Sequence, residues 1–217
     1  MNTDTAYEAL ILASGSPRRQ QILRQMGLPF TVLPAHIDET IENVSPEQNT
    51  VDLAREKAES VRKRYKNEFS TQHWIVGADT VIVLDNAIIG KPADRDDARR
   101  ILTALSGLSH SVVTGIALTV ENCTCTSIPR VETAAVRTEV SFATLDPEEI
   151  DWYLDTGEWQ GAAGGYRIQG KGACFITRIE GSYSNVIGLP INTFYGMLKL
   201  THYTGVAGIY FPPSDSQ

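Results

Sequence analysis

The sequence predicts an α/β fold built on a mixed sheet. Segments with the apolar pattern of strands alternate along the chain with segments of helical periodicity, and capping residues or glycines mark most of the boundaries. The 217 residues contain no internal repeat, and 42% of them are apolar, which is enough for a sizeable core. We therefore expect one α/β domain over residues 1–217, with two lobes around a central cleft.

Elements in the first half alternate between short strands and helices. Ser16 as N-cap, Pro17 in the first turn and Gly27 just past the end mark the first helix. Apolar residues that recur at steps of three and four between residues 51 and 65 mark the second helix. In order, the sequence predicts strand 10–13, helix 17–26, strand 30–33, a polar loop 36–45, helix 46–66 and strand 74–84.

The second half adds a pair of long β-rich segments and several glycine-rich loops. Asp146, Pro147 and Glu149 form a capped helix start. The two β-rich segments are expected to be antiparallel neighbours. In order, we expect a return strand at 88–89, helix 94–105, strands 111–120 and 131–144, helix 146–156, a glycine-rich stretch 161–172, strand 173–179, loop 181–190, helix 191–200 and a flexible tail over about 204–217.

Composition excludes several classes of function. The chain has 19 Lys and Arg against 26 Asp and Glu, and this net charge of −7 argues against a large nucleic-acid surface. The apolar runs are too short to span a membrane, and the N-terminus lacks the order of a secretory signal. The three cysteines lack zinc or disulfide spacing and are expected to be free, buried thiols. We expect a cytoplasmic protein that binds neither nucleic acid nor membrane.

The turn from the first strand into the first helix is a candidate anion site. Ser14, Ser16, Arg18 and Arg19 stand where free N–H groups and the helix dipole attract phosphate. A plain helix cap is the alternative. Arginines at a helix start oppose the dipole, however, and this conflict favours a functional role.

Two lysines could add positive charge to that site. Lys57 lies beside the apolar stripe of the second helix, and Lys91 lies in a Gly-Lys-Pro turn. Each could equally be a surface lysine. Together with the arginines they could neutralise a triphosphate.

Asp79 is the candidate for catalysis. It stands within an apolar strand pattern, where aspartate is rare and costly to bury unpaired. It therefore requires a metal, a cation or a role in proton transfer, and a capped strand end is the alternative. Asp38 and Glu39 could join it around a hard divalent cation such as Mg²⁺, which takes one or two carboxylates together with waters and phosphates. Alone, those two acids would be a solvated pair.

The glycine-rich stretch is a candidate for reading a base. Its glycines allow the backbone to approach a ligand closely. Gln169 offers a donor and an acceptor suited to a pyrimidine edge, and Tyr166 offers a ring. The alternative is a flexible hairpin with an aromatic anchor.

Several motifs, taken in order, resemble the Maf family of nucleotide pyrophosphatases. The similarity covers about residues 9–200, and the ordered set is specific although each block is weak alone. The blocks are residues 12–19 (Leu-Ala-Ser-Gly-Ser-Pro-Arg-Arg), 53–58 (Leu-Ala-Arg-Glu-Lys-Ala), 77–81 (Gly-Ala-Asp-Thr-Val), 90–92 (Gly-Lys-Pro), 105–107 (Leu-Ser-Gly), 114–115 (Thr-Gly), 166–170 (Tyr-Arg-Ile-Gln-Gly) and 180–190.

The resemblance implies a Maf/inosine-triphosphatase-like fold and a cytoplasmic homodimer with a link to septum formation. It also implies hydrolysis of a nucleoside triphosphate to the monophosphate and pyrophosphate with a divalent metal cation such as Mg²⁺ or Mn²⁺. Asp79 matches the family's proton acceptor. Arg18, Thr80 and Gln169 match the specificity positions of the dTTP/UTP branch, and Glu39, Lys57 and Lys91 match the metal and phosphate positions.

One segment departs from the pattern of that branch. Where the branch reads Asp-Lys-Ala-Gly-Ala-Tyr-Gly-Ile-Gln-Gly, residues 161–170 read Gly-Ala-Ala-Gly-Gly-Tyr-Arg-Ile-Gln-Gly. An acid and a lysine are lost and Arg167 is added, which bears on the base preference. Two alternatives to a dTTP/UTP enzyme are a non-enzymatic, nucleotide-binding regulator of septation and the same chemistry on modified or other nucleotides. Metal-dependent release of pyrophosphate separates the enzyme from the regulator.

Overall fold

A seven-stranded mixed sheet organises the computed structural model, which describes residues 9–38, 45–69, 71–123 and 130–205. The strand order is β2-β1-β3-β5-β6-β7, and β4 pairs with β3. β1 is parallel to β2 and β3, whereas β3, β5, β6 and β7 are antiparallel in turn. The strands are β1 (Leu10–Leu12), β2 (Thr31–Val32), β3 (His73–Leu84), β4 (Ala87–Ile89), β5 (Ser109–Glu121), β6 (Val131–Phe142) and β7 (Ile176–Glu180). The predicted mixed α/β class is confirmed.

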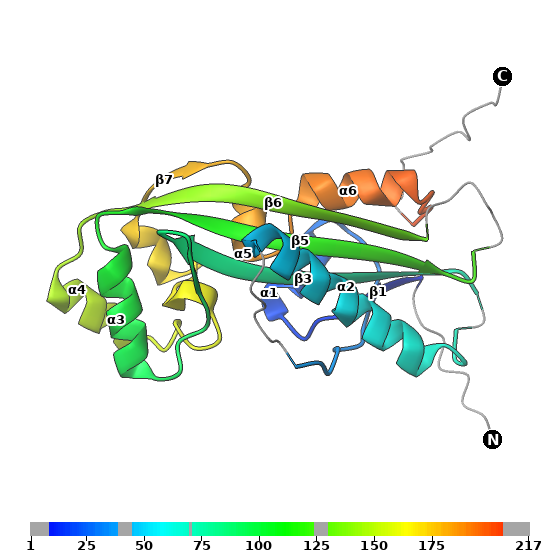
Figure 1. Ribbon diagram of the computed structural model, residues 1–217, viewed down its shortest axis with the longest axis horizontal. Helices are drawn as coiled ribbons and strands as arrows, with labels where there is room; N and C mark the ends of the chain where they lie inside the picture. The colour runs from blue at the N-terminus through cyan, green and yellow to red at the C-terminus, as the bar shows by residue number, and fades with distance from the viewer. Residues whose placement is uncertain (1–8, 39–44, 70, 124–129, 206–217) are drawn as a thin grey trace.

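Helices gather at the two ends of the long strands. Figure 1 shows β3, β5 and β6 running the length of the molecule, with α3 and α4 at one end and α1, α2 and α6 at the other. The helices are α1 (Pro17–Gln25), α2 (Pro46–Tyr65), α3 (Arg95–Leu105), α4 (Pro147–Asp155), α5 (Tyr183–Ile187) and α6 (Ile191–Leu200), with 3₁₀ turns η1 (Ala163–Gly165) and η2 (Lys171–Phe175).

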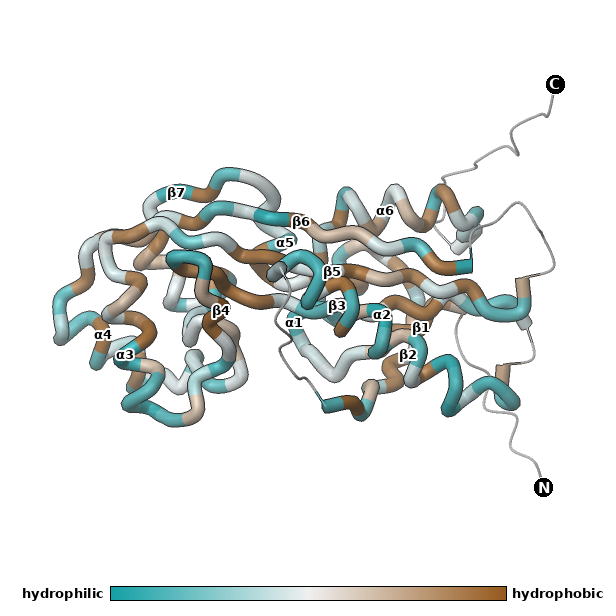
Figure 2. Tube along the Cα trace, viewed as in Figure 1, coloured by the Kyte–Doolittle hydropathy of each residue, from teal (hydrophilic) through white to brown (hydrophobic). Residues whose placement is uncertain are grey.

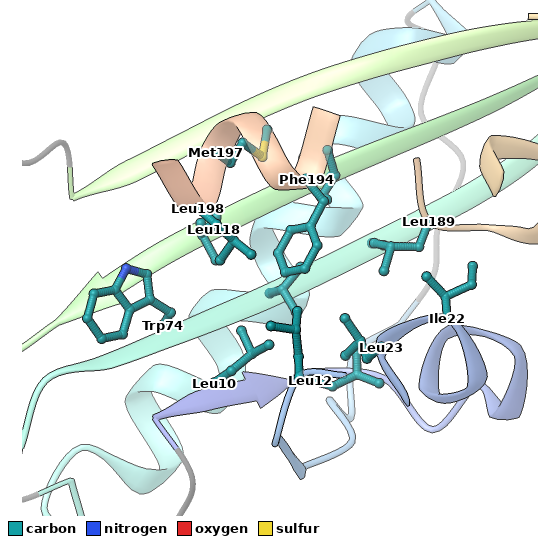
Figure 3. Close-up of a cluster of buried hydrophobic side chains, with 14 of the residues drawn as sticks. Leu10, Leu12, Ile22, Leu23, Trp74, Leu118, Leu189, Phe194, Met197 and Leu198 are labelled. Atoms are coloured by element: carbon teal, nitrogen blue, oxygen red, sulfur yellow. The ribbon is translucent and has the colours of Figure 1, made fainter. Parts of the chain in front are cut away.

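Side-chain alternation along β1 places helices on both faces of the sheet. Leu10 and Leu12 pack in a cluster with residues of α1 and α6, whereas Ile11 and Ala13 pack with residues of α2. Figure 3 shows the first cluster, in which Phe194 and Leu198 of α6 lie over the strands. A further cluster joins α3 and α4 to the other end of the sheet. Figure 2 shows the apolar stretches along the central strands. The two lobes therefore have separate cores on one continuous sheet.

Two glycines allow α2 to lie directly on the strands. A Cβ on Gly77 would stand 2.0 Å from the carbonyl oxygen of Ala54, and one on Gly115 would stand 2.2 Å from the backbone carbon of Thr50. Real Cβ atoms do not approach backbone so closely, so only glycine fits at either position. This close docking determines where the side chains of α2 meet β3.

Two predicted elements were wrong. The strand expected at 173–179 begins at Ile176, because η2 winds the preceding residues into a 3₁₀ turn that buries Phe175. The loop expected at 181–190 contains α5, which Ser182 caps by accepting from the backbone N–H of Asn185. Gly188, with a φ of 115°, ends this helix in a left-handed conformation.

Some predictions fall outside the described residues or need refinement. Glu39 and nearly all of the expected tail over 204–217 lie outside the described part of the chain. Cys123 and Cys174 are free thiols, but the first is half-buried and the second exposed, so the prediction of burial was wrong. Among the described residues, no helix is long and apolar enough to cross a membrane.

Candidate active site

A cavity of about 410 Å³ opens beside β3, in a gap between two of its neighbours. β1 pairs only with residues 74–76 of β3, and β4 pairs only with residues 82–84. Asp79 and Thr80 lie in the stretch between these ladders and both line the cavity. Because successive side chains of a strand point to opposite faces, the two residues reach the cavity from opposite sides of the sheet.

The structure brings the predicted site residues together around this cavity. Those that the structure describes all line it: Ser14, Ser16, Arg18, Arg19, Lys57, Asp79, Thr80, Lys91 and Gln169. Asp38 is exposed and is not among the lining residues, and Glu39 lies outside the described residues. Within the described lining, five side chains are basic and Asp79 is the one carboxylate. In a chain with a net charge of −7, this cavity concentrates positive potential and favours a polyanion.

Asp79 forms a buried ion pair with Lys57. The Lys57 Nζ donates to Asp79 Oδ1 at 2.7 Å, and the two side chains are 8% and 11% exposed. The pair explains how an aspartate can lie in an apolar strand, because Lys57 of α2 supplies the cation that the buried carboxylate requires. No described residue forms a hydrogen bond with Oδ2, so that oxygen is available to a ligand.

Arg19 holds the first turn of α1 against the sheet. Its Nε donates to the carbonyl oxygen of Gly188 at 2.8 Å, its Nη1 to Ser14 Oγ at 3.0 Å and its Nη2 to Thr80 Oγ1 at 3.1 Å. The residue is 9% exposed. Its position at a helix start is therefore explained by three acceptors, two of which, Gly188 and Thr80, come from distant parts of the chain. Ser14 also accepts from the backbone N–H of Ser16 at 3.3 Å.

The sequence analysis did not identify the chain of hydrogen bonds that runs from Thr80 through Thr114 to Asn185. Thr114 Oγ1 donates to the carbonyl oxygen of Asn185 at 3.0 Å, so Thr80 supplies the proton of the 3.0 Å bond between the two threonines. Asn185 is fully buried, and its Nδ2 donates to Val112 O and Thr138 Oγ1. Thr80 and Thr114 are cross-strand partners of β3 and β5. Thr114 and Asn185 stand in blocks of the family resemblance, 114–115 and 180–190, but the sequence analysis gave neither a role in the site.

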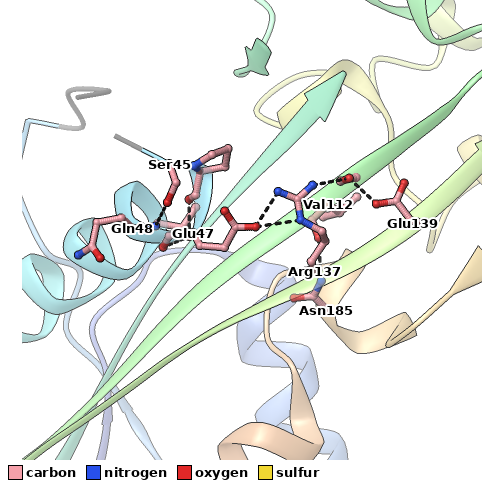
Figure 4. A network of polar contacts seen from close by, with 10 residues as sticks. Ser45, Glu47, Gln48, Val112, Arg137, Glu139 and Asn185 are labelled. Carbon is pink, nitrogen blue, oxygen red and sulfur yellow. Dashed lines mark hydrogen bonds and ion pairs between the residues drawn. The ribbon is translucent and has the colours of Figure 1, made fainter. Parts of the chain in front are cut away.

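A second polar network anchors the start of α2. Arg137 of β6 donates to Glu47 Oε1 from Nε at 2.8 Å and from Nη2 at 2.6 Å, and its Nη1 donates to Ser111 Oγ at 2.6 Å (Figure 4). Ser111 in turn donates to Glu139. Ser45 caps the same helix by accepting from the backbone N–H of Gln48 (Figure 4). The cap fixes the Glu47 end of the ion pair, and Ser111 fixes the Arg137 end. The network fixes the helix that carries Lys57.

Another part of the cavity lining comes from the glycine-rich stretch. Gln169 is exposed, and its Nε2 lies 3.5 Å from Gln21 Oε1, which is the outer limit of a hydrogen bond. Tyr166 is buried, and its hydroxyl lies 2.8 Å from His110 Nε2. Burial lowers the pKa of His110 to about 4 and raises that of Tyr166. Both side chains are thus neutral at pH 7, and Tyr166 is held in place while Gln169 can turn toward a ligand.

Arg18, in the first turn of α1, also lines the cavity. Burial lowers the pKa of Arg18, and the positive charges of Arg167 and Arg19 lower it further. No carboxylate of the described residues contributes to this environment. An anion in the cavity would therefore be attracted to Arg18.

The described residues contain no group of three or more His, Cys, Asp or Glu side chains that could hold a metal ion by themselves. Among the described lining residues, the one carboxylate is that of Asp79. Mg²⁺ commonly binds one or two carboxylates and takes its other ligands from water and substrate phosphates. The donor set fits a divalent cation that arrives with a triphosphate rather than one held by a complete protein cage.

Comparisons with known proteins identify the family of the chain. The family model described as Maf-like protein matches residues 9–201. A dTTP/UTP pyrophosphatase of Halalkalibacterium halodurans is 45% identical over 88% of this chain and 95% of the relative. Another, of Symbiobacterium thermophilum, is 43% identical over 93% of this chain and all of the relative. A solved HAM1 protein from Coxiella burnetii has a TM-score of 0.38 at 18% identity, covering 65% of this chain and 89% of that one. By the family match and the identity to its relatives, the chain belongs to the Maf-like protein family.

Proposed function

We propose that this protein hydrolyses dTTP and UTP to the nucleoside monophosphate and pyrophosphate. The observation that carries the proposal is the Lys57–Asp79 pair, which places one carboxylate in a cavity whose other charged side chains, among the described residues, are all basic. The names of the curated relatives, dTTP/UTP pyrophosphatase, support the same reaction.

The basic side chains are proposed to bind the triphosphate. Arg18 in the first turn of α1 and Lys91 after β4 both line the cavity, as do Ser14 and Ser16 with their hydroxyl groups. Charge-assisted hydrogen bonds to phosphate oxygens are roughly twice as strong as neutral ones. Arg19, by contrast, already donates to Ser14 and Thr80, so its contribution is to orient those hydroxyls.

Asp79 is proposed to accept the proton of the attacking water. Lys57 holds Oδ1 and fixes the rotamer of the carboxylate, which leaves Oδ2 for a water in line with the α-phosphorus. The bond between the α-phosphorus and the bridging oxygen then breaks, and pyrophosphate leaves. A divalent cation such as Mg²⁺ or Mn²⁺, when bound, neutralises charge that develops on the phosphate oxygens. Asp79, together with Glu39 outside the described residues, is the proposed protein contribution to its ligands.

The base is proposed to lie against the glycine-rich wall. The amide of Gln169 can both donate to and accept from a uracil or thymine edge, where carbonyls flank an N–H. The hydroxyl of Thr80 is engaged by Arg19 and Thr114, so its role is to keep this part of the wall small and fixed.

Family membership also supports a single-domain, cytoplasmic homodimer with a link to septum formation. The continuous sheet through both lobes supports the single domain. These points rest on the family and are proposed with the reaction.

The test is release of pyrophosphate and monophosphate from dTTP, UTP, GTP and 7-methyl-GTP, with Mg²⁺ or Mn²⁺ and with EDTA. We expect metal-dependent turnover, with UTP and dTTP preferred. Asp79→Asn should abolish turnover, whereas Asp85→Asn, an exposed control near the end of the same strand, should leave it unchanged. Circular dichroism verifies that both variants fold.

Two outcomes would contradict the proposal. Tight nucleotide binding without turnover would favour the regulator. Faster hydrolysis of 7-methyl-GTP than of UTP would show that the base assignment is wrong.

A further inference from the structure

Arg167 lines the cavity but has no part in the function proposed above. It lies in the segment that departs from the dTTP/UTP branch pattern. Its backbone N–H donates to Tyr153 Oη at 3.0 Å, and its Nη2 donates to the carbonyl oxygen of Gln160 at 2.7 Å. Its Nε is buried and has no hydrogen-bond partner among the described residues. The guanidinium is thus held in place, and Nε is among its unused donors.

Arg18 is the second guanidinium of this part of the cavity. It forms no hydrogen bond or ion pair with any described residue, whereas Arg19 and Lys57 each have buried partners. Arg167 is close enough to lower the pKa of Arg18, after burial itself. Two like charges are therefore held near each other in a partly desolvated place without a described carboxylate between them.

We propose that Arg18 and Arg167 together form a phosphate-binding pair, which holds a phosphate group of the substrate and of released pyrophosphate. The identity of that ligand rests on the function proposed above. A multiply charged phosphate relieves the repulsion between the guanidiniums and offers enough oxygens to accept from both. A neutral base carbonyl could accept one hydrogen bond but would leave the repulsion in place.

Preorganisation strengthens this assignment. Gln160 holds one nitrogen of Arg167, and the backbone beside it is tied to Tyr153, so little side-chain freedom is lost when an anion binds. The added arginine should therefore make this chain retain pyrophosphate more tightly than it would with a neutral residue there.

Calorimetric titration of the full-length protein with pyrophosphate, and separately with thymidine, tests the pair in the absence of metal. Arg167→Gln should weaken pyrophosphate binding by roughly 10- to 150-fold, the range expected for a hydrogen bond to a charged group. Thymidine affinity should stay within twofold. Arg167→Lys should restore part of the loss, because it returns the charge without the planar fork.

Arg178→Gln is the matched control, because Arg178 is an exposed arginine of β7 that is paired with Glu180. It should bind pyrophosphate as the wild type does, and thermal melts show whether each variant is folded. Pyrophosphate affinity within twofold of wild type in Arg167→Gln would overturn the pair, as would undetectable binding to the wild type. An equal loss for thymidine would also overturn it, since it would show that Arg167 shapes the wall rather than binding an anion.

The binding assay and the turnover assay fail independently. If no triphosphate is hydrolysed but pyrophosphate binding depends on Arg167, the proposed function is wrong and the phosphate pair stands. If triphosphates are hydrolysed but binding does not depend on Arg167, the pair alone is wrong.

Discussion

Replacing Gly77 by alanine should push helix α2 away from strand β3. It should thereby reduce activity, although the substituted residue does not line the cavity. The new Cβ would stand 2.0 Å from the carbonyl oxygen of Ala54 and 3.0 Å from the backbone nitrogen of Ala58. Both obstacles are helix backbone, so no side chain can swing away. An ordinary contact begins near 3.4 Å, and α2 must therefore move by about 1.4 Å.

The magnitude follows from the geometry of the ion pair. Lys57 is on the displaced helix, and the 2.7 Å contact to Asp79 would open to about 4 Å if the side chains did not follow. A displacement of about 1 Å in a catalytic group can cost about 100-fold in rate, so we expect a fall in kcat of that order. Overpacking of this kind should also lower the free energy of unfolding by about 1–3 kcal/mol.

The assay compares two identical substitutions. Gly196→Ala lies in α6, where an added Cβ meets nothing within 4 Å, and it should raise the free energy of unfolding by up to about 1 kcal/mol without changing turnover. Urea denaturation and kcat for dTTP are measured for both variants. Wild-type kcat and stability in Gly77→Ala would refute the docking argument. A loss of stability with unchanged kcat per folded molecule would refute the link from helix position to catalysis.

Three further predictions concern single side chains. Lys57→Met should lower the free energy of unfolding, measured with urea, by about 3 kcal/mol, because it leaves the carboxylate of Asp79 without its cation. This value is at the low end for breaking a buried pair, because the pair lies beside a cavity that admits water. A loss near zero would contradict the pair. Gln169→Glu should erode the preference for UTP over 7-methyl-GTP in a competition assay, because a carboxylate no longer donates to a carbonyl; an unchanged ratio would remove Gln169 from base recognition. Burial lowers the pKa of His110 to about 4 from a usual 6.5, so the unfolded chain takes up the proton first and stability should fall by up to about 3 kcal/mol as the pH drops from 6.5 to 4. His110→Gln should remove this part of the pH dependence in urea titrations, and His36→Gln, an exposed control, should keep it; an equal slope in both variants would show that His110 is not its source.

Elements with strong local signals were predicted well. The helix expected at 46–66 from its apolar periodicity is α2, Pro46–Tyr65. Asp146 with Glu149 forms the expected capping box of α4, because these bonds join residues three apart and depend little on the rest of the fold. The 3₁₀ turn η2 and helix α5 were missed. Both are only five residues long, too short for periodicity to be visible, and they are stable because Phe175 and Asn185 are buried against other elements.

By itself, the sequence determined the fold class, the family and which residue types could form the site, because those follow from local patterns and ordered motifs. Only the tertiary structure decided which side chains pair. Lys57 meets Asp79 across 22 positions because two glycines let α2 lie on the sheet. Arg19 donates to the carbonyl oxygen of Gly188, which is 169 positions away. Arg18 instead lines the cavity together with Arg167. Contacts between residues so far apart depend on how whole elements dock, and no local periodicity records that geometry.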